Sequence, residues 1–242
     1  MIDLHCHLIP HVDDGARSLE DAVEMARTLV SLGFTAAAPS PHNRPQYASW
    51  SHERTLTQKA LLQDALNAQG IALALHDNAE NDLMDDRFVP QMGTPDARLV
   101  GGAGGKYVLV EAPYGSPVPA LREILFRVKV KGITPLIAHP ERCLEFQRKG
   151  RAAEAVAAGA LLQLDIGALT GRYGPDAKKW ARTLLDDGLY AVGATDLHAP
   201  VNAKGWVGEA LAELRKRAGA AEFDRMMTER PGRILGGEPV EL

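Results

Sequence analysis

Histidine and carboxylate side chains occur along this chain at positions that suit metal binding. Imidazole nitrogens and carboxylate oxygens, with no thiolate cluster, favour manganese, iron or zinc over a structural zinc site built from cysteines. Because the candidate ligands exceed the needs of one ion, we predict a centre of two or three ions with bridging carboxylates. The nine candidate positions are His5, His7, Asp14, His42, Glu80, Glu111, His139, Asp196 and His198, with Asp13 as the alternative to Asp14 and Asp165 as a further carboxylate at a strand end.

Each candidate taken alone has an ordinary explanation. A histidine at a strand end is usually a surface or core residue, and an acidic residue there is most often a helix N-cap, which Asp14 could also be. Coincidence is a poor explanation when nearly every expected strand ends in a side chain of this kind. The whole set therefore predicts a metal site.

Ions about 3.5–4 Å apart are suited to phosphoryl transfer, because they bind phosphate oxygens and generate hydroxide near neutral pH. A phosphate also favours a bidentate cation, and Arg142 follows His139 by three positions. We predict that Arg142 reaches the same site; the alternative is a solvated salt bridge. A tyrosine leaving group, with a pKa of about 10, departs without strong acid catalysis, which favours aryl phosphates.

Apolar runs and helical patterns alternate along the chain and must position these residues. Strands are expected at residues 2–5, 34–38, 71–75, 107–111, 133–138, 161–165 and 189–195. Helices are expected after a capping box at 18–21 and at about 53–69, 121–128, 152–158 and 176–187. This alternation predicts a parallel sheet, and seven strands favour a closed α/β barrel made by residues 1–242 as one domain.

An open, doubly wound sheet is the alternative to the barrel, but no glycine-rich phosphate turn follows the first strand. The cluster Gly101–Gly105 precedes a strand, so we interpret it as a flexible turn. In a parallel barrel the C-terminal ends of all strands lie at one rim, where active sites are built. Candidate ligands that are far apart in sequence would therefore converge on one mouth.

Composition excludes several classes of protein. The hydrophobic fraction of 45% excludes a disordered chain, and only two cysteines, Cys6 and Cys143, exclude a disulfide scaffold and suit a reducing compartment. A net charge of −4, from 27 basic and 31 acidic residues, lacks the basic excess of a nucleic-acid-binding protein. With no bilayer-spanning apolar run and no evident signal peptide, we expect a cytoplasmic protein that is not embedded in a membrane.

A cysteine-dependent tyrosine phosphatase is also excluded. Its nucleophilic cysteine requires an arginine six positions later, which closes a loop around the phosphate. Val12 lies six positions after Cys6, and Lys149 lies six positions after Cys143. We therefore expect both thiols to be packing residues.

Five motifs together resemble the polymerase-and-histidinol-phosphatase (PHP) superfamily, and more narrowly its bacterial tyrosine-phosphatase branch, which is associated with capsule and exopolysaccharide operons. The similarity extends from residue 2 to about residue 235, in the order expected of the superfamily. The motifs are Asp3-Leu4-His5-Cys6-His7, Asp13-Asp14-Gly15, Ala138-His139-Pro140-Glu141-Arg142, Leu169-Thr170-Gly171 and Thr195-Asp196-Leu197-His198.

The resemblance implies a distorted (β/α)7 TIM-like barrel with three divalent metal ions, most commonly Mn²⁺, although Fe or Zn would also suit the ligands. Arg142 would hold the phosphate, and Arg142, Glu80 and Asp14 would be the catalytic residues. The motif alone prefers Asp14 to Asp13, and the two residues could be exchanged. The implied ion sites are His5, His7, Glu80 and Asp196; Glu80, Glu111 and His139; and Asp14, His42 and His198.

The chain departs from the pattern of this branch at three places. The segment 77–82 around Glu80 is unusually acidic, Ala112 replaces a common phenylalanine, and Asp165 replaces a common asparagine or serine. These differences bear on the substrate more than on the metal site. They would fit a different phosphoester, or an extra carboxylate beside the ligands at Asp165.

The resemblance implies a metal-dependent protein-tyrosine phosphatase that uses a metal-activated hydroxide. Its partner would be a phosphotyrosine protein, such as a bacterial tyrosine autokinase of capsular or exopolysaccharide biosynthesis, and a homo-oligomer remains open. Alternatives are a small-molecule phosphoesterase such as histidinol-phosphatase, a PHP nuclease, or a metal-loaded binding module without turnover. The acidic composition argues against long nucleic acids. An amidohydrolase would usually have a metal-bridging lysine where this chain has Glu111.

Overall fold

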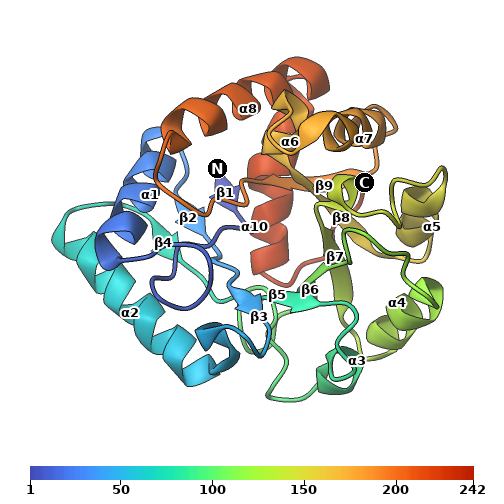
Figure 1. Ribbon diagram of the computed structural model, residues 1–242, viewed down its shortest axis with the longest axis horizontal. Coiled ribbons are helices and arrows are strands. Elements are labelled where there is room, and N and C mark those ends of the chain that lie inside the picture. The colour runs from blue at the N-terminus through green and yellow to red at the C-terminus, as the bar shows by residue number, and fades with distance from the viewer.

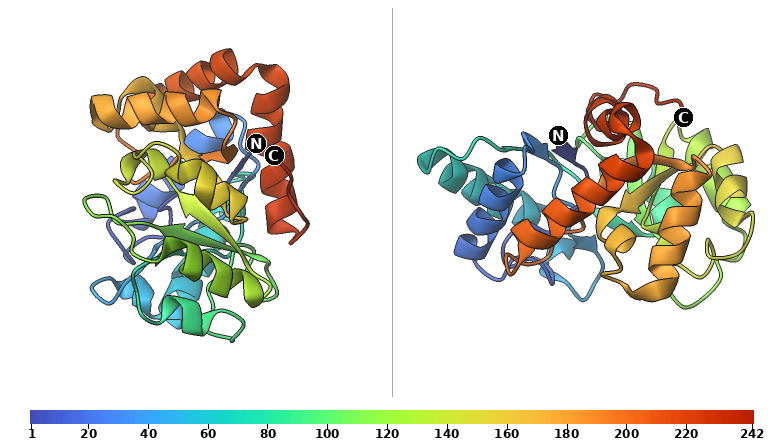
Figure 2. Two further views of the ribbon diagram at one scale, coloured as in Figure 1. Left: turned by 90° about the vertical axis from the view of Figure 1, so that its right-hand side faces the viewer. Right: turned by 90° about the horizontal axis from the view of Figure 1, so that it is seen from above.

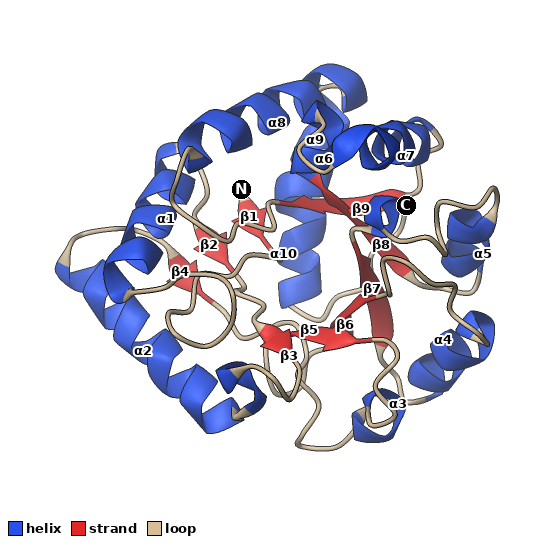
Figure 3. Cartoon of the chain, in the orientation of Figure 1, coloured by secondary structure: helices blue, strands red, loops and turns tan.

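The computed structural model describes residues 1–242 and shows a ring of helices around a parallel sheet (Figures 1 and 3). One sheet has the order β1-β2-β4 and the other β3-β5-β6-β7-β8-β9, with all pairs parallel. The strands are β1 (Ile2–Asp3), β2 (Ala36–Ala37), β3 (His42–Asn43), β4 (Ala74–Leu75), β5 (Glu80–Asp82), β6 (Tyr107–Glu111), β7 (Thr134–Ala138), β8 (Leu161–Asp165) and β9 (Tyr190–Ala194). The predicted α/β class is confirmed.

The two sheets join into a distorted barrel with seven strand positions. The segments β2 and β3 occupy the second position, and β4 and β5 occupy the third. A parallel bridge between Cys6 and Leu197 links the chain after β1 to the chain after β9. The buried Asp3 carboxylate reinforces this seam, because it accepts hydrogen bonds from the Thr195 amide at 3.1 Å and hydroxyl at 2.6 Å. The prediction of a (β/α)7 TIM-like barrel is confirmed.

The breaks in the second and third positions correct the expected strands at 34–38 and 71–75. After β2, the Ser40 amide still donates to the Cys6 carbonyl at 2.8 Å. Pro41 then has no amide hydrogen to donate, and pairing passes to β5 through the register His42 with Glu80. His42 and Glu80, expected to follow strands, therefore lie inside short strands of their own.

Most of the helices cover the outside of the barrel, whereas α10 lies across its centre in the view of Figure 1. The Ser18 hydroxyl accepts the Asp21 amide hydrogen at 3.1 Å and caps α1, as the capping-box pattern predicts. The expected helices agree with the observed ones to within about two residues, the usual uncertainty of helix ends. The helices are α1 (Leu19–Ser31), α2 (His52–Ala68), α3 (Phe88–Gln91), α4 (Leu121–Val130), α5 (Arg151–Ala157), α6 (Ile166–Thr170), α7 (Gly174–Asp186), α8 (Ala203–Ala218), α9 (Ala220–Asp224) and α10 (Arg230–Leu235).

Successive side chains along a strand point alternately into the barrel interior and into the layer beneath the helices. In β6, Leu109 belongs to an inner apolar cluster, whereas Val108 and Val110 pack in the outer layer. Ile234 of α10 joins the inner cluster, so α10 closes one end of the barrel. Figure 2 shows α10 and both chain ends on that side. No helix combines the length and apolarity needed to cross a membrane.

The glycine cluster before β6 forms a turn, as expected, and it packs closely against neighbouring backbone. The Gly101 amide donates to the Asp77 carbonyl at 2.8 Å. Gly101 has φ +83°, and a Cβ atom there would lie 2.8 Å from the Leu235 carbonyl oxygen. Glycine is therefore required at this position, both for its backbone conformation and for the approach of α10.

Candidate metal centre

All nine candidate ligands lie at the barrel end opposite α10. Their ligand atoms form four groups, and within each group the atoms lie within 4.8 Å of one another. Because the groups share members, they make one continuous cluster. The groups are His7, Asp14, His42 and His198; His5, His7 and Asp196; His5, Glu80 and His139; and His42, Glu80 and Glu111.

Left-handed backbone conformations occur at two candidate ligands that follow long strands. His139 follows β7 with φ 32°, and Asp196 follows β9 with φ 50°. Residues other than glycine adopt this left-handed region at a cost of about 1–3 kcal/mol each, and such strain is concentrated at functional sites. The surrounding fold therefore stabilises two unfavourable backbone conformations at candidate ligands.

Glu80 lies at the centre of the cluster. Its Oε1 atom is 3.0 Å from His139 Nε2 and 3.4 Å from His5 Nε2. Its Oε2 atom is 2.8 Å from His42 Nδ1 and 3.7 Å from His7 Nε2. Burial opposes ionisation of this carboxyl group, but the surrounding imidazoles hold its pKa well below the usual range. The two oxygens thus face different histidines, as a bridging carboxylate would.

Contacts between Nδ1 and an oxygen atom orient three of the histidine rings. His5 Nδ1 lies 2.8 Å from Gln163 Oε1, and His198 Nδ1 lies 2.8 Å from the Asp196 carbonyl oxygen. His7 Nδ1 lies 2.6 Å from Asp13 Oδ2. A ring nitrogen facing an oxygen acceptor carries the proton, so the Nε2 lone pair of each ring is directed into the cluster.

Asp13 and Asp14 have different surroundings. The buried Asp13 side chain contacts His7 and accepts the amide hydrogens of Gly15 at 3.0 Å and His42 at 3.1 Å. Burial opposes its charge, but His7 lowers its pKa to about 2. Asp14 Oδ1 instead lies 3.5 Å from His42 Nε2 and 3.6 Å from His198 Nε2. Asp14 is therefore the member of the pair that lies among the candidate ligands.

The arrangement of donor atoms fits divalent cations. His5 Nε2 and His7 Nε2 lie 3.4 Å apart, and both are 3.3 Å from Asp196 Oδ1. Although Glu80 Oε2 and His42 Nδ1 lie close together, neither buried atom makes a hydrogen bond, and buried His139 Nδ1 also has no hydrogen-bond partner. Such crowding of lone pairs is unfavourable unless positive charge lies among them. Consistent with this, burial opposes the charge on His5, but Glu80 and Asp196 raise its pKa to about 9.

Arg142 faces the same cluster from the short 3-10 turn Pro140–Arg142. Its Nη1 atom donates to Asp196 Oδ2 at 2.5 Å and to Asp165 Oδ2 at 3.2 Å. Asp165 also caps α6 by accepting the Gly167 amide hydrogen at 2.9 Å. The substitution noted at position 165 therefore places a carboxylate beside Arg142.

Sequence and structure comparisons bear on this centre. The profile of a family described as "Capsular polysaccharide synthesis, CpsB/CapC" matches residues 1–236. This chain belongs to that family. Tyrosine-protein phosphatase YwqE of Bacillus subtilis (strain 168) is 27% identical over 249 residues, 99% of this chain and 93% of that protein. Tyrosine-protein phosphatase CpsB of Streptococcus pneumoniae is 24% identical over 250 residues, 97% of this chain and 98% of that protein.

The fold of this CpsB/CapC-family chain also matches a solved relative. A crystal structure described as that of YwqE from Bacillus subtilis and CpsB from Streptococcus pneumoniae, metal-dependent tyrosine phosphatases, has a TM-score of 0.86 to this chain. The two chains are 28% identical, and the match covers 100% of this chain and 96% of the other. The resemblance to PHP-type tyrosine phosphatases is thereby confirmed.

The structure gives two further residues of this family member a role beside the cluster that the sequence analysis did not assign. Glu141 is fully buried, accepts the Asp165 amide hydrogen at 2.9 Å and the Tyr190 hydroxyl hydrogen at 2.8 Å, and so fixes the turn that carries Arg142. Burial and neighbouring Asp165 raise the pKa of Glu141 to about 8. Arg44 forms an ion pair with Glu111. Its position two residues after His42 is the sequence feature that could have indicated a place near the cluster.

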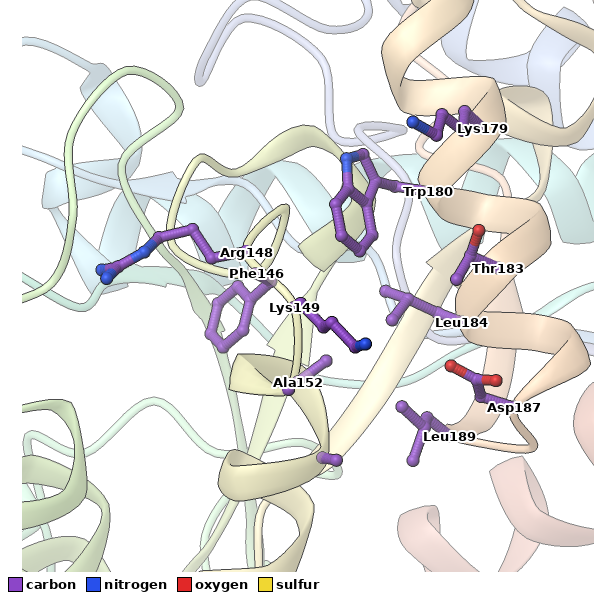
Figure 4. A pocket seen from close by; sticks show the side chains of 12 residues that line it. Phe146, Arg148, Lys149, Ala152, Lys179, Trp180, Thr183, Leu184, Asp187 and Leu189 are labelled. Atoms are coloured by element: carbon purple, nitrogen blue, oxygen red, sulfur yellow. The ribbon is translucent and has the colours of Figure 1, made fainter.

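A separate cleft of about 310 Å³ lies between α5 and α7 (Figure 4). Phe146, Trp180 and Leu184 line it, with Lys149 and Lys179 among its charged residues. None of the candidate ligands borders this cleft. The chemistry of the CpsB/CapC-family chain is therefore assigned to the barrel mouth by its side chains, independently of cavity size.

Proposed function

We infer that this chain is a metal-dependent tyrosine-protein phosphatase that hydrolyses phosphotyrosine in a protein substrate. The observation that carries this conclusion is the buried cluster around Glu80, with Arg142 beside it. The near full-length similarity to YwqE and CpsB, both named tyrosine-protein phosphatases, supports the same activity. Residues 1–242 would act as a single phosphoesterase domain.

The cluster would hold three divalent ions, with Mn²⁺ the expected metal. Ions of this kind polarise phosphate oxygens and supply hydroxide near neutral pH. The four overlapping groups of ligand atoms, in which His5, His7, His42 and Glu80 each occur twice, support several neighbouring ion positions. We assign them to His5, His7, Glu80 and Asp196; to Glu80, Glu111 and His139; and to Asp14, His42 and His198.

Residues around the cluster would bind the substrate and preserve the geometry. Arg142 would hold the phosphate with its planar guanidinium group, which matches two phosphate oxygens at once. Asp13 and Gln163 would keep His7 and His5 in the tautomer that binds metal. Glu80 and Asp14 would act through the ligand set. Tyrosine is a good leaving group, so no strong general acid is required.

The CpsB/CapC family name connects this activity to capsular polysaccharide synthesis. We propose that the substrate is a phosphotyrosine protein of a polysaccharide system, such as a bacterial tyrosine autokinase. A cytoplasmic location remains a prediction that agrees with two unpaired, buried cysteines.

The test uses enzyme stripped with EDTA, with p-nitrophenyl phosphate and a phosphotyrosine peptide as substrates. We expect little turnover in the stripped enzyme and recovery of both activities when Mn²⁺ is added. A His139→Ala variant should lose metal and nearly all activity while its circular dichroism spectrum stays unchanged. Metal-independent turnover, or full activity of that variant at saturating Mn²⁺, would contradict the assignment.

A further inference from the structure

An exposed tyrosine lies beside Arg142 at the barrel mouth. Tyr114 follows Glu111 by three positions in the loop after β6, and it is 46% exposed. Its ring centroid is 4.9 Å from Arg142 Cζ and 5.7 Å from the His139 ring centroid. We propose that Tyr114 is the wall against which the phosphotyrosine ring packs, and that it selects aryl over alkyl phosphates. This inference rests on the proposed phosphatase function.

The backbone of Tyr114 is held in place by the loop that follows Arg142. Its carbonyl oxygen accepts the Leu144 amide hydrogen at 3.0 Å. Pro113 precedes it and restricts the backbone further. Tyr114 and Arg142 are therefore carried by two loops that are hydrogen-bonded to each other, which fixes the ring relative to the phosphate-binding guanidinium group.

Tyr114 differs from the other two tyrosines of the mouth. Tyr173 is half-buried, with its ring centroid 4.1 Å from Arg142 Cζ. Tyr47 is also half-buried, its ring stacks on His42 with centroids 5.2 Å apart, and its hydroxyl donates to Asp14 at 3.3 Å. Both of these rings serve to support residues of the site. Tyr114 is the tyrosine that keeps a large accessible surface for a ligand.

The chemistry of the substrate places its ring near this surface. The phosphotyrosine ring is separated from its phosphorus atom by one ester oxygen, so a phosphate held by Arg142 brings the ring within reach of Tyr114. A stacked or edge-to-face aromatic pair would favour an aryl ligand by about three- to tenfold over an alkyl one. Phosphoserine has no ring and would gain nothing from Tyr114.

The test measures binding and turnover in the Mn²⁺-loaded full chain. Calorimetry gives the dissociation constants of phenylphosphonate and methylphosphonate, and kcat/KM is measured with a phosphotyrosine peptide. The variants are Tyr114→Ala and Tyr114→Phe. The matched control is Phe126→Ala, which removes a 65% exposed ring from α4, outside the barrel mouth.

We expect wild type to prefer phenylphosphonate, and Tyr114→Ala to lose about three- to tenfold of that preference and of peptide kcat/KM. Tyr114→Phe, which retains the ring, should keep the preference for phenylphosphonate, and the Phe126→Ala control should keep both the preference and kcat/KM. Equal weakening of both phosphonates by Tyr114→Ala would overturn the inference, because it would show that Tyr114 only positions Arg142. A wild-type protein without preference would also overturn it. Absence of Mn²⁺-dependent peptide turnover in wild type would instead overturn the proposed function, which the phosphonate ratio does not measure.

Discussion

Strands β1 to β5 contain two or three residues each, whereas β6 to β9 contain five each. In the first half, side-chain amides supply hydrogen bonds where the strands are broken: Asn78 Nδ2 donates to the Leu4 carbonyl at 2.9 Å, and Asn81 Nδ2 donates to the Leu109 carbonyl at 3.0 Å. In the second half, backbone ladders pair each strand from β6 to β9 with the next, with one register shift between Leu162 and Gln163 of β8.

The two halves also place candidate ligands differently. The first half places His42 and Glu80 within its short strands and only His5 and His7 just after a strand end, whereas the second places Glu111, His139 and Asp196 at or just after strand ends. This contrast indicates that the short strands of the first half (β1 to β5) position polar groups, while the longer strands of the second half (β6 to β9) act as the scaffold. Substitutions in the first half should therefore alter metal binding and activity, and interior substitutions in the second half should alter stability.

The largest effect is expected from Glu80→Gln. Because Glu80 lies at the centre of the cluster, this change would remove several kcal/mol of electrostatic stabilisation and reduce kcat/KM for phosphotyrosine by about 10³-fold. The matched control is Glu145→Gln in the second half, where the buried carboxylate accepts the Val118 amide hydrogen at 3.0 Å. The control should lose about 1–3 kcal/mol of unfolding free energy with unchanged kcat. Equal activity loss in both variants would remove the distinction between the halves.

Leu109→Ala tests the scaffold half. Leu109 is fully buried in the inner apolar cluster, so its truncation should leave a cavity and lower the unfolding free energy by about 2–5 kcal/mol. Denaturant unfolding of the metal-free protein gives this value. At a temperature where the variant is folded, kcat should match wild type; a large loss of kcat would show that the scaffold and the site are coupled.

Asp13→Asn sharpens the comparison within the first half. The amide cannot accept the His7 proton as strongly as the carboxylate, so Mn²⁺ affinity should fall by about 10–100-fold. Titration of stripped protein with Mn²⁺, followed by activity, measures this shift. Activity should return at high Mn²⁺; a loss that no metal concentration restores would assign Asp13 a direct role in the reaction.

Arg142 belongs to the second half but faces the cluster, so Arg142→Lys should affect the site although it lies among the longer strands. Lysine keeps the charge but loses the planar pair of donors, so affinity for phosphate or vanadate should fall by about tenfold. Inhibition constants for the two anions provide the measurement, with the melting temperature as a control for folding. Wild-type affinity would remove Arg142 from the site.

Strand length also explains what the sequence could predict. The expected strand 107–111 and the run 161–165 agree with β6 and β8, because buried five-residue strands appear as largely apolar runs, interrupted in β8 by Gln163. No apolar run predicts how the chain is paired around Pro41 and Asn78. There the hydrogen bonds come from the Asn78 side chain and from a change of pairing between β2–β4 and β3–β5. The nine candidate ligands could be proposed from the sequence because most of them follow expected strands, and the structure brings all nine into one cluster. The roles of Glu141 and Gln163 could not be predicted, because they depend on contacts between segments that are far apart in the sequence.

The most direct test of the central claim is to titrate EDTA-stripped protein with Mn²⁺ while measuring bound manganese and phosphotyrosine-peptide hydrolysis in the same samples. The cluster predicts activity that is absent in the stripped protein and rises with occupancy towards about three ions per chain. Full turnover by stripped protein in EDTA, or complete metal loading without turnover, would contradict the assignment of this barrel mouth as a metal-dependent phosphatase site.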